Sequence, residues 1–255
     1  MLGNDPSYEY TKESFIAYAR KIKADFLILT QASNANTSVQ PRSLFESAML
    51  MKLELGKFLT DYSRVLYLDA DILVSPHADN IFDIYPDTDR LYLYNEAINS
   101  DRTGELSLMR KFLTEDTNQS YWNVGVLLLS RGCGFIREIE LESLYYFYQN
   151  SKFFEQTYIN LWIRQHNIKV EDLNNKFNYM ANSGTKEARF SASFIHYAGH
   201  GFCKKSFRPV LIRQDYFHMF SLKSKLIENL NFLGRYCSFR LSRLVNKIVS
   251  RFFRG

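Results

Sequence analysis

Apolar residues follow two patterns along the chain, one with helical spacing and one with unbroken runs. Apolar positions that recur every three or four residues predict helices over residues 11–23, 42–60, 135–148 and 154–166. Short continuous apolar runs predict buried strands over residues 26–29, 64–74, 91–94, 123–130 and 194–199. Because helices and strands alternate, this order predicts an α/β domain with a doubly wound, mostly parallel sheet.

One predicted strand, residues 64–74, contains two carboxylates. Asp69 and Asp71, separated by Ala70, interrupt an otherwise mostly apolar run. Burial of two carboxylates without a partner is costly, so we expect a cation beside them. Ligands of open α/β sheets bind at the carboxyl ends of strands, and a hard cation with a phosphate-bearing ligand suits such a pair. A structural ion pair with Arg64 or Lys52 is the alternative that this pattern leaves open.

The composition suits one α/β domain followed by a basic tail. The chain has 255 residues, of which 46% are hydrophobic, which is enough for a sizeable core. The net charge of +5 is concentrated in residues 221–255, where eight Lys or Arg accompany one Glu, so the preceding residues carry −2. A body with this charge disfavours binding of nucleic acid.

Cysteine usage and the N-terminal sequence indicate a cytoplasmic protein. The three cysteines, Cys133, Cys203 and Cys237, are odd in number and lack the spacing of a metal site. This usage suits a reducing compartment. The N-terminal residues are polar and lack a signal-peptide pattern, and no apolar run reaches the length of about 18 residues that spans a bilayer.

Five motifs occur in a specific order along the chain. They are Lys52 in a predicted helix and the segments 67–74 (YLDADILV), 123–126 (NVGV), 155–160 (EQTYIN) and 196–199 (HYAG). In this order they resemble the motifs of the family 8 retaining glycosyltransferases, over residues 3 to about 205. The resemblance implies a GT-A fold, which is a single Rossmann-like α/β domain with a mixed, mostly parallel sheet, over residues 1–215.

The resemblance also implies a reaction and a metal. Family members transfer a hexose, glucose or galactose, from a UDP-sugar to a glycan acceptor, such as lipopolysaccharide or another surface glycan. Asp69, Asp71 and His196 are expected to hold Mn²⁺, with Mg²⁺ as the alternative. Two carboxylates and an imidazole suit Mn²⁺ better than an all-oxygen Mg²⁺ site. His196 is otherwise interpreted as a half-buried strand histidine, and His200 is its nearby competitor.

A second set of residues is expected to bind the donor or act on it. The resemblance assigns donor contacts to Lys52, Asp69, Ala70, Asp71, Asn123, Gly125, Gly199 and Lys204. Asn123 is expected to hydrogen-bond the sugar, and Gly125 to allow its close approach. Glu155 takes the place of a sugar-binding Asp, and Gln156 is expected beneath the anomeric carbon. A polar turn that caps the following helix is the other interpretation of these two residues.

The mechanism is expected to be front-face transfer with retention. Retaining hydrolases use a close pair of carboxylates, whereas no second carboxylate is obvious in the sequence beside Gln156. Catalysis would then depend on positioning and electrostatics. Asn123, Glu155 and Gln156 are the residues expected to take part.

The chain departs from the family pattern at three points. It begins after most of the family's first strand, which helps hold the uracil base, and Thr157 stands where many members have Asp. The K-P-W motif after the histidine motif is missing, so Lys204, Lys205 or Arg208 would have to reach the diphosphate. These departures support a second hypothesis, a catalytically impaired or non-catalytic relative that binds nucleotide sugar weakly or acts as a membrane-associated partner. An inverting transferase or a nucleotidyltransferase is disfavoured by the Glu155-Gln156 segment.

Residues 216–255 are predicted to form a basic, amphipathic, helical tail. Its apolar stripe consists of Leu241, Leu244, Val245, Ile248, Val249, Phe252 and Phe253, at helical spacing. Five cations accompany the stripe: Arg240, Arg243, Lys247, Arg251 and Arg254. This pattern predicts that residues 221–255 associate with an anionic membrane surface, at the inner face of the membrane. A helix docked on the body is the alternative.

Overall fold

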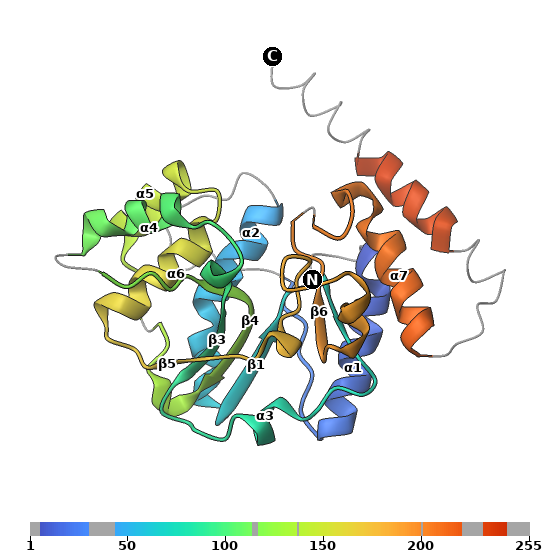
Figure 1. Ribbon diagram of the computed structural model, residues 1–255, viewed down its shortest axis with the longest axis horizontal. Coiled ribbons are helices and arrows are strands. Elements are labelled where there is room, and N and C mark those ends of the chain that lie inside the picture. Colours follow the sequence, from blue (N-terminus) through green and yellow to red (C-terminus); the bar gives the residue numbers. More distant parts are fainter. Residues whose placement is uncertain are drawn as a thin grey trace, which may run out of the picture.

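The computed structural model describes residues 6–30, 44–113, 117–136, 138–199, 201–220 and 232–243. Its strands are β1 Arg64–Leu68, β2 Ile72–Val74, β3 Leu91–Asn95, β4 Trp122–Ser130, β5 Val170–Asp172 and β6 Phe194–His196. Its α-helices are α1 Glu9–Ile22, α2 Leu44–Leu50, α3 Ile81–Ile84, α4 Thr103–Met109, α5 Leu141–Asn150, α6 Phe154–Gln165 and α7 Arg208–Met219. The longest of the 3₁₀ helices is η2, Met51–Thr60, which continues directly from α2. The α/β class predicted from the sequence is therefore confirmed (Figure 1).

The strands form two sheets with mixed pairing. A four-stranded sheet has the order β1-β4-β3-β5, and β2 pairs with β6. The expectation of mostly parallel pairing is wrong for the described strands, because only β3 and β5 run parallel and the other ladders are antiparallel. The long β4 runs antiparallel to both of its neighbours, β1 and β3, so both ladders at the centre of the four-stranded sheet are antiparallel.

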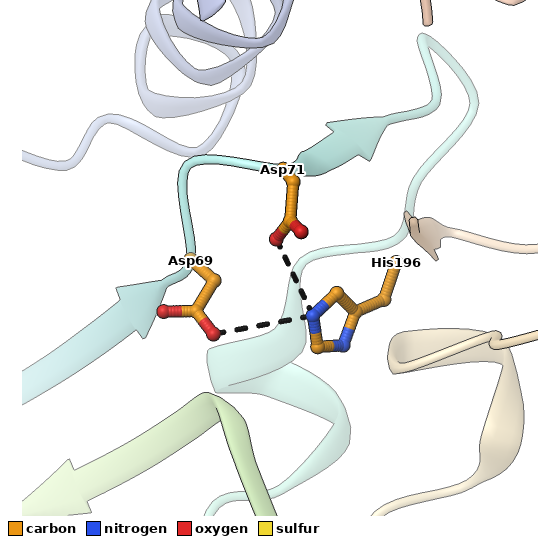
Figure 2. A group of neighbouring side chains, drawn as sticks. All are labelled: Asp69, Asp71 and His196. Atoms are coloured by element: carbon orange, nitrogen blue, oxygen red, sulfur yellow. Dashed lines mark ion pairs between the residues drawn. The ribbon is translucent and has the colours of Figure 1, made fainter. Parts of the chain in front are cut away.

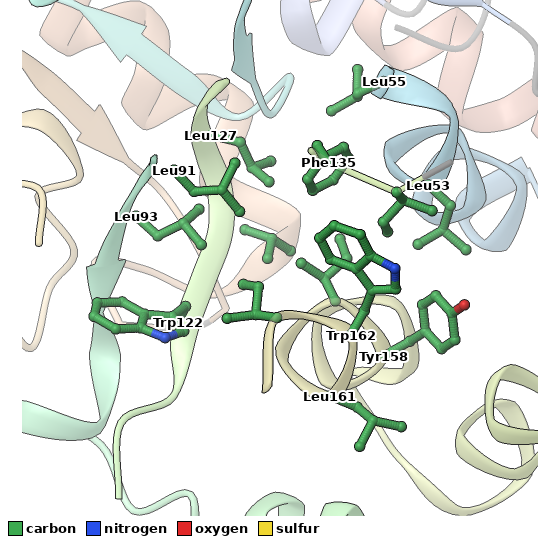
Figure 3. Packing of buried hydrophobic residues seen from close by; sticks show 14 of the residues in the cluster. Leu53, Leu55, Leu91, Leu93, Trp122, Leu127, Phe135, Tyr158, Leu161 and Trp162 are labelled. Carbon is green, nitrogen blue, oxygen red and sulfur yellow. The ribbon is translucent and has the colours of Figure 1, made fainter. Parts of the chain in front are cut away.

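The unbroken apolar run of β4 reflects burial on both of its faces. All nine of its residues are buried. Because side chains alternate across a strand, Leu127 and Leu129 join one hydrophobic cluster, whereas Val126 and Leu128 join another. In the first cluster, side chains from α6 and η2 pack against the sheet (Figure 3). Trp162 from α6 lies edge-to-face with Phe135, at 5.7 Å between ring centroids.

The segment 26–29, predicted to be a buried strand, is neither a strand nor buried. Residues 24–30 have no regular structure, and the side chains of Leu27 and Ile28 are 53% and 39% exposed. No described strand pairs with this segment. Apolar composition alone was therefore insufficient to predict a strand here, because a strand also needs a neighbouring strand for its backbone hydrogen bonds.

A middle segment of the predicted tail, residues 232–243, contacts the body. Residues 232–243 are helical, and Phe232 is fully buried in a cluster with Tyr10 and Tyr216. The hydroxyl of Tyr236 donates to the carbonyl of Ser206 at 3.0 Å. The expected boundary between residues 215 and 216 falls inside α7. Most of the predicted apolar stripe, residues 244–253, lies outside the described residues.

None of the described helices combines the length and the apolar character that a membrane span requires.

Candidate active site

The two carboxylates lie in the tight turn that joins β1 to β2. The N–H of Ile72 donates to the carbonyl of Asp69 at 3.1 Å, which closes the turn. The N–H of Asp69 donates to the carbonyl of Gly125 in β4 at 2.8 Å, and the N–H of Tyr197 donates to the carbonyl of Asp71 at 3.0 Å. The backbone of each acid is thereby tied to a different sheet, so the orientation of both side chains depends on tertiary structure.

His196 joins the two acids because β6 pairs with β2. Ile72 lies opposite His196 in this ladder, which brings the imidazole to the turn. Nε2 of His196 lies 3.4 Å from Oδ1 of Asp71 and 3.9 Å from Oδ2 of Asp69 (Figure 2). One potential ligand atom from each side chain lies within 4.8 Å of the others. The structure therefore brings together the three residues predicted to bind a metal.

The orientation of the His196 ring suits a metal ligand. Its Nδ1 lies 2.8 Å from Oδ1 of the fully buried Asn178, whose Nδ2 donates to Oδ1 of Asn123 at 2.9 Å. Since the Asn178 oxygen can only accept, Nδ1 donates to it, and Nε2 is the ring nitrogen that faces the two carboxylates. A hydrogen-bonded Nδ1 is the usual support of a histidine ligand. Two carboxylates and an imidazole in this arrangement fit a divalent cation such as Mn²⁺.

Gly125 makes room for this imidazole. A Cβ atom built at Gly125 would lie 2.2 Å from Cε1 of His196, a distance that no side chain tolerates. The space beside Gly125 is therefore occupied by His196, which corrects the expectation that this glycine lets the donor sugar approach. The second glycine of the predicted set, Gly199, has a φ of +61°, and its carbonyl accepts a hydrogen bond from Nη2 of Arg208 at 2.7 Å.

Each acid of the turn is already paired with a cation of the protein. Nζ of Lys52 lies 3.0 Å from the carboxylate of Asp69, which also accepts from the hydroxyl of Tyr67 at 2.7 Å. Nη1 of Arg208 lies 2.5 Å from Oδ2 of Asp71. The predicted alternative of an ion pair with Lys52 is thus found at Asp69 and does not exclude the metal hypothesis. Arg64 takes no part, since its guanidinium donates to backbone carbonyls at the opposite end of β1.

Burial and charge compete at these groups. Burial alone would raise the pKa of Asp71, but the hydrogen bond and charge of His196, together with Arg208, hold that pKa below its usual range. Burial would lower the pKa of Lys52, but the carboxylates of Asp69 and Glu155 raise it. Asp71 and Lys52 are therefore both charged at neutral pH, and the cluster is an array of fixed charges.

Glu155 extends this array toward the middle of the cleft. Its Oε1 lies 3.3 Å from Nζ of Lys52, whereas its Oε2 is buried without a hydrogen-bond partner. Burial raises the pKa of Glu155, and Lys52 opposes this shift. A buried acceptor with an unused oxygen is suited to a hydroxyl donor.

Hydrogen bonds at both ends of its amide group hold Gln156 in place. Its Nε2 donates to Glu96 at 2.7 Å, and its Oε1 accepts from the backbone N–H of Val124 at 3.2 Å. Asn123 joins the same network, because its Nδ2 donates to Oε2 of Glu96 at 2.9 Å. The alternative interpretation of Glu155 and Gln156 as helix caps is wrong, since residue 153 occupies the N-cap position of α6 without a side-chain cap.

A single cleft of about 3000 Å³ contains most of the predicted residues. Those that line it are Lys52, Asp69, Ala70, Asp71, Asn123, Glu155, Gln156, His196 and Gly199. Gly125 and Lys204 do not line it, and Lys204 is exposed. Lys205 and Arg208, the other two cations considered for the diphosphate, do line it. His200 lies outside the described residues.

Sequence reasoning missed the buried residues that position the site. Asn178 orients His196, and Glu96 organises Asn123, Gln156 and Arg102, whose Nε donates to it at 2.6 Å. Glu96 is also a second carboxylate beside Gln156, where none was expected. Its place directly after a predicted strand could have identified it, because ligands gather at strand ends. Asn178 carries no comparable signal.

Comparison with known proteins agrees with this geometry. The sequence profile described as "Glycosyl transferase family 8" matches residues 6–201. This chain belongs to glycosyl transferase family 8. The galactosyltransferase LgtC, solved with donor and acceptor sugar analogs, has a similar structure with a TM-score of 0.57 and 16% sequence identity, over 92% of this chain and 98% of LgtC. Among curated proteins, no sequence match was found.

A second solved structure extends the similarity in fold. It is a glycosyltransferase involved in glycosylation of the major capsid of PBCV-1, with a TM-score of 0.54 and 12% identity, over 84% of this chain and 95% of that one. The family and the GT-A fold show that the protein is a glycosyltransferase. Enzymes of family 8 use nucleotide sugars and typically a divalent metal, and the residues of this chain that would hold such a metal are Asp69, Asp71 and His196.

Proposed function

We propose that this glycosyltransferase moves a hexose, glucose or galactose, from a UDP-sugar to a glycan acceptor with retention of configuration. Mn²⁺, or alternatively Mg²⁺, would be bound by Asp69, Asp71 and His196. The observation that carries the proposal is the convergence of two carboxylates and a correctly oriented imidazole in the cleft that also contains Glu155 and Gln156.

The charges of the cleft are suited to a nucleoside diphosphate. A divalent cation at the three ligands would neutralise negative charge on the leaving diphosphate. Arg208, at the first turn of α7, is the cation of the protein nearest to Asp71 and takes the place of the missing family lysine in the proposal. Guanidinium binds phosphate through two parallel hydrogen bonds, so release of Asp71 would leave Arg208 free for the diphosphate.

Glu155 and Gln156 are proposed to bind and orient the hexose. The unpartnered Oε2 of Glu155 would accept a hydrogen bond from a sugar hydroxyl. Gln156 is held by hydrogen bonds with Glu96, Asn123 and the backbone of Val124, so its amide would present a fixed dipole to the reacting carbon. Fixed dipoles stabilise developing charge without the cost of reorganisation.

Glu96 bears on the stereochemical mechanism. A carboxylate beside Gln156 could in principle serve as a nucleophile. Glu96 is only 2% exposed, however, and its two oxygens accept hydrogen bonds from Asn123, Gln156 and Arg102. Front-face transfer, in which the leaving phosphate takes the acceptor's proton, therefore remains the proposal. An inverted anomeric configuration in the product, observed by proton NMR, would refute it.

The deciding experiment is a panel of UDP-sugars with Mn²⁺, scored for slow hydrolysis of the donor. We expect one UDP-hexose to be hydrolysed, and Asp71→Asn to reduce its hydrolysis by more than about 100-fold, as expected for removal of a charged group that supports a leaving diphosphate. Asp87→Asn is the matched control, because Asp87 belongs to a second Asp-x-Asp sequence that lies exposed in a loop. Stabilisation by UDP and Mn²⁺ without any hydrolysis would instead support the non-catalytic relative.

We further propose that the enzyme acts at the inner face of a membrane, attached through residues 221–255. In the described part of the tail, the exposed side chains of Arg240, Leu241 and Arg243 support this proposal. Since Phe232 belongs to the core, the test should keep it. Arg240→Glu with Arg243→Glu should release the protein from anionic vesicles in a sedimentation assay, whereas unchanged sedimentation would refute attachment through this surface.

A further inference from the structure

The helix that carries Glu155 and Gln156 begins without a cap of its own. Phe153, at the N-cap position of α6, makes no capping hydrogen bond with its side chain. Instead, the hydroxyl of Ser151 accepts from the N–H of Phe153 at 2.9 Å and donates to Oε2 of Glu105, in α4, at 2.6 Å. The start of α6 is therefore attached to a neighbouring helix through a side-chain carboxylate.

Glu105 also binds the residue that directly follows Gln156. Oγ1 of Thr157 donates to the same Oε2 at 2.7 Å and lies 2.7 Å from the hydroxyl of Tyr121. Thr157 and Tyr121 are both fully buried. Because Thr157 gives its only hydroxyl proton to Glu105, the bond between the two hydroxyls runs from Tyr121 to Thr157. Burial raises the pKa of Tyr121 well above its ordinary value, so this donor keeps its proton.

The network holds the first turn of α6 on both sides of Gln156. Ser151 precedes Gln156 and Thr157 follows it, and both hydroxyls are bound to one oxygen of Glu105. Further along the helix, the side chain of Asn160 makes two hydrogen bonds with the backbone of β4, at 2.7 and 2.9 Å. The sheet therefore fixes the middle of α6, whereas Glu105 fixes its first turn.

We propose that Glu105 is a positioning residue, whose carboxylate places Gln156 beneath the donor hexose through Ser151 and Thr157. This inference rests on the proposed sugar transfer and adds a residue from outside the cleft, since none of Glu105, Ser151 and Thr157 lines it. Glu105 acts through α6 rather than by contact with the substrate. Its charge also suits the positive end of the helix dipole, and loss of the shared acceptor would leave the buried hydroxyl of Thr157 without one.

The alternative is a purely structural role for the same network. In that case the hydrogen bonds would only stabilise the contact between α4 and α6, and their loss would lower the free energy of unfolding without moving Gln156. The two roles therefore differ in what happens to the amide of Gln156 and to the turnover rate, and both can be measured.

The first test compares the kinetics of Glu105→Ala and Glu105→Gln. Alanine removes the shared acceptor, whereas glutamine keeps an amide oxygen that can accept from both hydroxyls. We expect alanine to lower kcat for donor hydrolysis at least about tenfold and to change KM for the UDP-hexose less than about threefold, because a misplaced dipole weakens transition-state stabilisation more than ground-state binding. Glutamine should keep kcat within about threefold of the wild type. Glu142→Ala is the matched control, since Glu142 is exposed in the first turn of α5.

The second test observes Gln156 in the free protein by NMR. Its side-chain amide signals are assigned by their loss in Gln156→Glu. In Glu105→Ala these signals should shift, and their protons should exchange with water at least about tenfold faster, whereas Glu105→Gln should leave both nearly unchanged. This measurement needs no donor. If the wild type hydrolyses no UDP-sugar, the proposed function fails, and the NMR result still decides whether Glu105 positions Gln156.

Three results would overturn the proposal. The first is a Glu105→Ala variant with unchanged Gln156 signals, and the second is one that is less stable in urea but retains its kcat. The third is an equal loss of kcat with alanine and glutamine, because an acceptor oxygen would then not be what matters. Should Glu105→Ala not fold, Thr157→Val breaks the same link and should show the same changes, whereas Thr157→Ser should not. Unchanged Gln156 signals in Thr157→Val would equally overturn it.

Discussion

Replacement of Gly125 by alanine would force the imidazole of His196 out of its position. The added Cβ would lie 2.2 Å from Cε1, whereas ordinary contact begins at 3.4 Å, so the ring must move by the difference of 1.2 Å. Such a shift stretches the 2.8 Å hydrogen bond to Asn178 and turns Nε2 away from the two carboxylates. Overpacking costs about 1–3 kcal/mol and the lost hydrogen bond about 1 kcal/mol, so we expect destabilisation of about 2–4 kcal/mol.

Two measurements follow this substitution. Urea denaturation would give the free energy of unfolding, and calorimetric titration would give the affinity for Mn²⁺, which should fall about 10–100-fold because a ligand is misplaced. Gly104→Ala is the matched control. A Cβ at Gly104 meets nothing within 4 Å, and this residue lies in α4, so alanine should stabilise the protein by about 0.4–1 kcal/mol.

A double-mutant cycle makes the reasoning refutable. In a His196→Ala background the obstructing ring is gone, so Gly125→Ala should cost less than about 1 kcal/mol. If the cost is the same with and without the imidazole, the clash is not its origin. Unchanged affinity for Mn²⁺ in Gly125→Ala would likewise refute the role of this glycine in placing His196.

Further substitutions test the neighbours of the two acids. Asn178→Ala should lower Mn²⁺ affinity about 10–100-fold in calorimetry, because the tautomer of His196 is no longer controlled, and an unchanged affinity would contradict this. Lys52→Met leaves the buried Glu155 and the partly buried Asp69 without their shared cation, so urea denaturation should show a loss of about 3–5 kcal/mol. A loss below about 1 kcal/mol, the usual value of a surface ion pair, would show that the pairing matters little. Arg208→Ala removes the cation paired with Asp71, so Mn²⁺ alone should bind more tightly and UDP should bind more weakly. If both affinities change in the same direction, Arg208 does not bind the diphosphate as proposed.

The pattern of apolar residues was sufficient to predict the bounds of those elements whose burial follows one pattern along their whole length. β4 is apolar throughout because both of its faces are buried, and the structure shows the predicted strand with one additional residue, Trp122. α6, predicted over residues 154–166, extends over Phe154–Gln165. The prediction of a buried strand over residues 26–29 was wrong, because apolar composition does not show whether a partner strand lies beside the segment.

The sequence by itself determined the α/β class, the family, and the residue types of the candidate metal site, because motif order and residue type are local properties of the chain. Only the tertiary structure decided which groups meet. The approach of His196 to Asp69 and Asp71 depends on the register between β2 and β6, and the need for glycine at position 125 depends on where that ring then lies. Such contacts join residues far apart in the chain, and their geometry follows from the packing of the whole fold rather than from any local pattern.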